Sequence, residues 1–133
     1  MDYRAIEKIL LMKKQALEQN ISDLQNRIGA CEAMINNRRQ QLAQTTIATD
    51  ASPGELQEYD HWGDVIRQYV DIEQRKRQGL EAELNPLKDK LKTVMVQLHH
   101  VHTLEEQAQN ALMRRQENEQ DGQRTNIWNL SQS

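Results

Sequence analysis

The N-terminal third of the chain repeats apolar residues at the spacing of a coiled coil. From Tyr3 to about residue 45 there is no proline, and strong helix-forming residues predominate. Alternating steps of four and three residues predict a helix over about residues 3–45 with one buried face. The two sets of seam positions are Leu10, Leu17, Leu24 and Cys31, and Ile21, Ile28, Ile35 and Leu42.

A second heptad pattern follows a short polar stretch. Residues 46–54 combine threonine, aspartate, serine, proline and glycine, which favours a loop. A helix is predicted over about residues 55–118, with Pro86 introducing a kink near residue 85. After Gly122 the periodicity is lost, so residues 119–133 are expected to form a flexible tail. The second seam comprises Leu56, Tyr59, Ile66, Val70, Leu80, Leu84, Leu87, Leu91, Val94, Leu98 and Val101, with Glu73 and Arg77 as polar interruptions, and Ala108 and Leu112 extend it.

Two helices joined by a short loop pack antiparallel, so the whole chain, residues 1–133, is predicted to be a single all-α, two-helix coiled-coil hairpin. If the chain folds about residue 50, residue i of the first helix faces about residue 101 − i of the second. That register predicts ion pairs of Arg27 with Glu73 and of Asp23 with Arg77. The longer second helix is then expected to overhang from about Val101 to Asn118. A parallel homodimer would satisfy the same seams, but the loop favours a hairpin that is monomeric when free.

Composition and charge exclude several functions. Aromatic residues make up 4% of the chain and phenylalanine is absent, so a thick core with an enclosed catalytic pocket is not expected. We therefore expect no enzymatic activity and no cofactor. The 17 basic and 20 acidic residues give a net charge of −3, and the basic groups are interleaved with acids, which argues against nucleic-acid binding. The single cysteine, Cys31, fits a reducing compartment and is expected to be a small buried apolar residue.

The remaining candidate chemistry is local. His99, His100 and His102 form the densest group of metal-ligand residue types, but no HExxH motif accompanies them, so we expect solvent-facing side chains and no metal site. No stretch approaches the roughly 20 apolar residues of a membrane span, and the first residues lack the apolar core of a signal peptide. The expected location is therefore cytoplasmic, without direct membrane insertion.

Two groups of residues are candidates for partner binding. Tyr59, Trp62 and Tyr69 gather most of the chain's few rings just after the loop, where they either anchor a partner or cap the coiled coil. Arg114 and Arg115 lie on the predicted overhang, where they either meet an acidic surface or only keep the helix end soluble.

The chain resembles the small coiled-coil stalk proteins of bacterial type III export machines, both the flagellar group (FliJ) and the virulence group (YscO or SctO). The resemblance consists of chain size, a loop near residue 50 and two helical ends. The first helix opens with IEKILLMKKQALEQNISDLQ, and the second ends with LEEQAQNALMRRQENEQDGQR. A straight stalk does not need Pro86, which is the one departure.

The resemblance implies a non-enzymatic stalk or adaptor in virulence or flagellar protein transport, at the periphery of the inner membrane. Its implied partners are a hexameric export ATPase, the cytoplasmic ring of the export gate, and secretion chaperones. By position, Lys8, Lys13, Leu112, Arg114 and Arg115 would face the ATPase. Tyr59, Trp62 and Tyr69 would face the gate. A generic structural scaffold or spacer is the alternative that the sequence leaves open.

Overall fold

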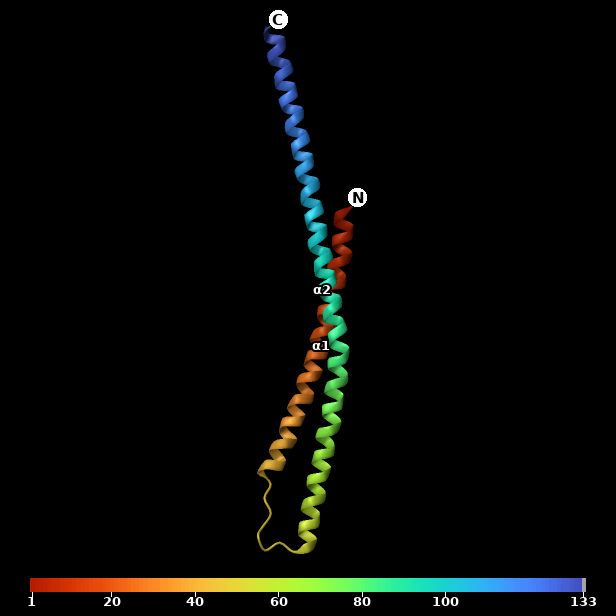
Figure 1. Ribbon diagram of the computed structural model, residues 1–133, viewed down its shortest axis with the longest axis vertical. Helices are drawn as coiled ribbons and strands as arrows, with labels where there is room; N and C mark the ends of the chain where they lie inside the picture. Colours follow the sequence, from red (N-terminus) through yellow and green to blue (C-terminus); the bar gives the residue numbers. More distant parts are fainter. Residues whose placement is uncertain (133) are drawn as a thin grey trace. The chain divides into compact units, whose positions relative to one another are not determined.

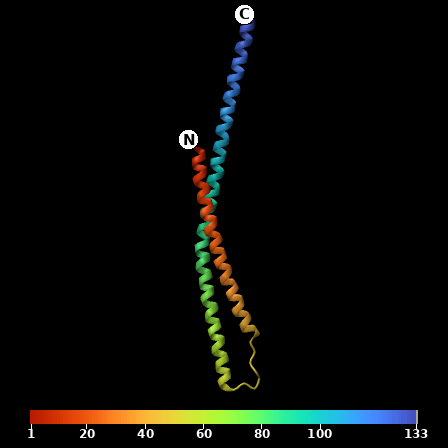
Figure 2. The ribbon, with the colours of Figure 1, turned by 180° about the vertical axis from the view of Figure 1, so that it is seen from behind.

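The computed structural model describes residues 1–132, which form two α-helices and no strand. Helix α1 spans Tyr3–Gln44 and helix α2 spans Pro53–Gln132. The ribbon views in Figures 1 and 2 show the two helices joined by one loop of residues 45–52. The predicted all-α, two-helix hairpin is therefore confirmed.

Both helices begin with a side-chain cap. The carboxylate of Asp2 accepts a hydrogen bond from the Ala5 amide at 3.2 Å, and the hydroxyl of Ser52 accepts one from the Glu55 amide at 3.2 Å. Each bond satisfies an amide that has no partner within the first turn of its helix. Because Pro53 lacks an N–H and has a fixed φ, it fits the first helical position, and α2 starts there, two residues before the predicted Glu55.

The chain divides into two compact units. We call Gln15–Leu91 the loop unit, and Met1–Lys14 together with Lys92–Ser133 the terminal unit. In each unit a segment of α1 packs along a segment of α2 through the predicted seam. The loop unit buries Ile21, Leu24, Ile28, Cys31, Ile35, Ile66, Val70 and Leu84, and the terminal unit buries Leu10, Val94, Leu98 and Val101.

The register of both units differs from the predicted one by about one heptad. In the terminal unit the side chains of Glu7 and His102 meet at 3.1 Å, and in the loop unit the guanidinium of Arg38 lies over the Tyr69 ring at 5.0 Å. In the predicted register, the numbers of two facing residues add up to about 101. For these two observed pairs the sums are 109 and 107. Consistently, Leu84 packs in a cluster with Ile21, Leu24 and Ile28.

The loop explains this difference. A heptad pattern looks the same after a shift of seven residues, so the apolar seams alone leave the register open. An extended residue spans about 3.3 Å, more than twice the roughly 1.5 Å of a helical residue. The eight loop residues therefore reach past the end of α1, and the first turns of α2 have no helical partner (Figure 1). Folding symmetrically about residue 50 was the wrong assumption.

The predicted ion pairs across the seam are consequently absent from the described chain. Glu73 pairs with Lys76 of α2 at 3.3 Å. The Arg77 Nε is buried without a hydrogen bond, and the nearest opposite charge is the Glu81 carboxylate of α2 at 3.7 Å. In the observed register Glu73 lies beside Cys31 of α1.

The course of α2 bears on two further expectations. The helix continues through Pro86. Because Pro86 has no N–H, the carbonyl of Ala82 lacks its usual hydrogen bond within the helix. Both residues are exposed, so water can hydrogen-bond to that carbonyl. The helix also continues to Gln132, where a flexible tail from residue 119 had been expected. A single glycine such as Gly122 lowers the stability of a helix by only about 1 kcal/mol relative to alanine, and no proline follows it in the sequence. Loss of an apolar period removes packing partners, but it does not by itself end the backbone hydrogen bonding.

The register can be tested by disulfide trapping in a Cys31→Ser background. Cysteines at positions 24 and 84 should cross-link efficiently in the folded protein, because both side chains belong to one buried cluster. Cysteines at positions 17 and 84, which the symmetric fold would place together, should cross-link poorly. Preferential trapping of the second pair, measured by non-reducing electrophoresis, would contradict the observed register.

Candidate partner-binding surfaces

The first candidate surface is a pocket in the loop unit where α2 begins. One face of α2 supplies residues at helical spacings of three and four, and the start of the loop supplies the opposite wall. The pocket has a volume of about 450 Å³ and is open to solvent. Its lining residues are Thr45, Ile47, Glu55, Glu58, Tyr59 and Trp62.

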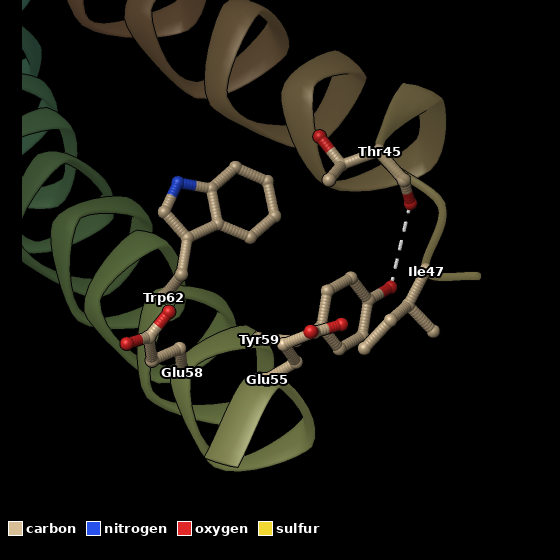
Figure 3. Close-up of a pocket in the computed structure, with 6 residues that line it drawn as sticks. All are labelled: Thr45, Ile47, Glu55, Glu58, Tyr59 and Trp62. Atoms are coloured by element: carbon tan, nitrogen blue, oxygen red, sulfur yellow. Dashed lines mark hydrogen bonds between the residues drawn. The ribbon is translucent and has the colours of Figure 1, made fainter. Parts of the chain in front are cut away.

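Two aromatic rings form the centre of this pocket. Tyr59 and Trp62 are half-buried, with ring centroids 6.3 Å apart and ring planes inclined by 33°. Figure 3 shows both rings rising from α2 toward the end of α1 and the loop. The Tyr59 hydroxyl donates a hydrogen bond to the Thr45 carbonyl at 3.4 Å. Tyr59 therefore connects the loop to α2 through this hydrogen bond, in agreement with the prediction that the rings cap the coiled coil. One side of the pocket remains open.

The surroundings of the pocket are acidic. Between Arg39 and Arg67 the sequence contains no lysine or arginine. Two of the carboxylates in this stretch, on Glu55 and Glu58, line the pocket itself. The rings are therefore bordered by carboxylates, and the basic group that follows in the sequence, Arg67, is paired with Asp64 at 3.1 Å. The five carboxylates of this stretch are Asp50, Glu55, Glu58, Asp60 and Asp64.

Tyr69, the third predicted ring, does not join the pocket. It is 48% exposed and lies against the Arg38 guanidinium, with the Arg38 Cζ 5.0 Å from the ring centroid. Together with Val65 and Ile72 it lines a shallow depression on α2. The predicted aromatic group is thus two separate features.

The second candidate surface belongs to the terminal unit. Lys8 and Lys13 are exposed on α1, and Leu112, Arg114 and Arg115 are exposed on α2. Since Glu7 lies opposite His102, Leu112 is ten residues further along α2, which corresponds to about 15 Å. The structure therefore does not bring the two lysines beside the other three residues.

The uncovered part of α2 starts later than predicted. Val101 is only 8% exposed because the observed register places it beside the start of α1. From Glu106 to Ser131 every described residue is exposed. Large apolar side chains on this segment include Leu112, Met113, Ile127, Trp128 and Leu130. We call Glu106–Ser131 the overhang.

One residue of the histidine group, His102, takes part in the contact between the helices. His99, His100 and His102 are exposed, and His102 contacts the Glu7 carboxylate across the seam. Within residues 1–132 no three histidine, cysteine, aspartate or glutamate side chains come together as a metal-binding group. Neither described helix is long and apolar enough to span a bilayer.

Cys31 is buried in the seam of the loop unit, as predicted. Burial raises the pKa of its thiol, and a hydrogen bond to the Glu73 carboxylate and the charge of that group raise it further. Lys76 and Arg27 oppose this effect only in part. A buried, protonated thiol packs as a small apolar residue and is a poor nucleophile.

Sequence reasoning missed the loop wall and the carboxylates of the pocket. Thr45 and Ile47 line the pocket with the rings because the start of the loop lies beside the first turns of α2, and no periodicity in the sequence signals this. The sequence does contain a signal for the carboxylates: no lysine or arginine occurs between Arg39 and Arg67, which indicates that Glu55 and Glu58 belong to an acidic segment.

In comparisons with known proteins, no family model, no curated protein and no solved structure matches this chain.

Proposed function

We propose that the protein is a non-enzymatic coiled-coil stalk of a bacterial type III export apparatus. In this role it links a hexameric export ATPase to the cytoplasmic ring of the export gate, with secretion chaperones as further partners. It works in the cytoplasm at the periphery of the inner membrane. The export assignment starts from the resemblance in size and helix arrangement, and flagellar and virulence systems fit it equally.

The observation that supports a binding role is the overhang. A single helix in water is only marginally stable, and most of its stability in proteins comes from packing an apolar face. Leu112 is 57% exposed and Met113 58%, next to Arg114 and Arg115. A partner that covers these side chains supplies the missing packing, and the two guanidinium groups orient it. We assign this segment to the ATPase.

The pocket of Tyr59 and Trp62 is assigned to the export gate. It belongs to the loop unit, whereas the overhang belongs to the terminal unit, so each partner has its own surface. Lys8 and Lys13 contribute to the ATPase contact only if the partner also covers the start of α1.

The direct test is binding of the intact chain to the export ATPase hexamer and to the cytoplasmic domain of the export gate from the same genome. Surface plasmon resonance should show saturable binding to both, and the ATPase should be stimulated. The matched control is the same measurement with a rotary ATPase that has no role in export. Absence of binding to either export protein would overturn the proposal and favour a structural scaffold or spacer.

A further inference from the structure

We propose that the pocket beside the loop is a binding site for an arginine side chain in a basic segment of a partner protein. The ligand chemistry follows from the pocket residues. The identity of the partner as an export-gate domain rests on the proposed function.

The aromatic part of the pocket suits a planar cation. The Tyr59 and Trp62 centroids are 6.3 Å apart and the rings are inclined by only 33°, so both offer ring faces to the same open space. A guanidinium over such faces gains cation–π attraction, and Trp is the strongest of the aromatic partners. The chain already contains one contact of this kind, since Arg38 lies 5.0 Å from the Tyr69 centroid. Among the described residues, no lysine or arginine lies over the ring of Tyr59 or Trp62 in this way.

The carboxylates complete the recognition of a cation. Glu55 and Glu58 line the same pocket, one turn apart on α2, and both are exposed at its rim. A carboxylate accepts two hydrogen bonds from a guanidinium in a planar pair, a geometry that a lysine ammonium lacks. Among the described residues neither carboxylate forms an ion pair with a lysine or arginine, so both are available to a basic group of a partner.

The register is the reason that this site is open. In a symmetric hairpin, α1 would pack over this part of α2, where Tyr59 lies in the predicted seam and Trp62 lies beside it. Because the loop takes over from α1 there, Thr45 and Ile47 line the pocket opposite the rings, and the pocket stays open to solvent. The structure therefore leaves an apolar floor with an acidic rim in place of a closed seam. Charge complementarity selects a basic segment as its occupant.

The test uses the intact protein and a fluorescein-labelled peptide of twelve alternating arginine and serine residues, followed by anisotropy. The double variant Glu55→Gln with Glu58→Gln should weaken binding about tenfold, and Trp62→Ala about fivefold or more. The matched control, Glu117→Gln with Glu119→Gln, removes the same charge from the exposed overhang and should change binding less than twofold. In a Trp128→Phe background, leaving Trp62 as the only tryptophan, the peptide should change the Trp62 emission.

Three results would overturn the inference. Equal weakening by the control variant would indicate diffuse electrostatic attraction. Equal binding of a peptide with citrulline in place of arginine would indicate an apolar groove. Self-association in sedimentation that disappears in the Glu55→Gln, Glu58→Gln variant would indicate that a second copy of the chain occupies the pocket. Circular dichroism melting checks that each variant remains folded.

The same variants separate this inference from the proposed function. If the arginine peptide binds as expected but no export-gate domain binds, the export assignment fails and the pocket chemistry stands. If the gate domain binds wild type and the Glu55→Gln, Glu58→Gln variant equally well, the pocket inference fails and the export assignment stands.

Discussion

Replacing Ile35 with aspartate is expected to unfold the loop unit under conditions where the wild type is folded. Ile35 is the least exposed core residue, at 3%, and it lies in the seam between α1 and α2. Aspartate there loses the burial of a large aliphatic side chain and places a carboxylate without a partner in an apolar seam. Together these effects cost about 3–5 kcal/mol, a large part of the stability of a small domain.

The neighbouring residue provides the control for this substitution. Met34 is 42% exposed on the same helix, so Met34→Asp costs at least as much helix propensity as Ile35→Asp but has little effect on burial. Urea unfolding followed at 222 nm should give a strongly lowered midpoint for Ile35→Asp and a nearly unchanged one for Met34→Asp. Equal midpoints for the two variants would show that the seam does not stabilise the hairpin.

Replacing Leu112 with aspartate is expected to abolish binding to the export ATPase without lowering the melting temperature. Full burial of a leucine contributes about 1.5–3 kcal/mol, and a carboxylate at that site would also have to lose its hydration in the complex. Because Leu112 is exposed in the free chain, the hairpin itself loses no packing. Arg114→Glu with Arg115→Glu should have the same outcome, through reversed charge and a slower association rate.

Met95 supplies the matched control on the same helix. It is half-exposed in the terminal unit, so Met95→Asp introduces the same charge outside the overhang and should leave ATPase binding intact. Binding is measured by surface plasmon resonance and stability by calorimetry. Wild-type affinity in the Leu112→Asp variant would mean that the overhang is not the ATPase contact.

The sequence by itself determined that there are two helices, where the loop lies, and most of the seam residues, although α2 ends later than predicted and the predicted seam residue Leu56 is 46% exposed. These are local properties: helix propensity, the alternating spacing of three and four, and the cap formed by Ser52 with Pro53 all act within a few residues. The polar interruption at Glu73 and Arg77 was recognised for the same reason. Exposure of Leu112, Arg114 and Arg115 also followed, because the second helical segment is much longer than the first.

Only the tertiary structure decided the register, and with it both candidate surfaces. A heptad seam pairs equally well after a shift of seven residues, so the choice depended on the loop, whose extended residues carry no periodic signal. That choice buried Val101, moved the start of the overhang to Glu106, and placed Arg38 over the Tyr69 ring. It also left Tyr59 and Trp62 beyond the end of α1, beside Glu55 and Glu58, because the loop residues that replace α1 there cover only one side of the rings.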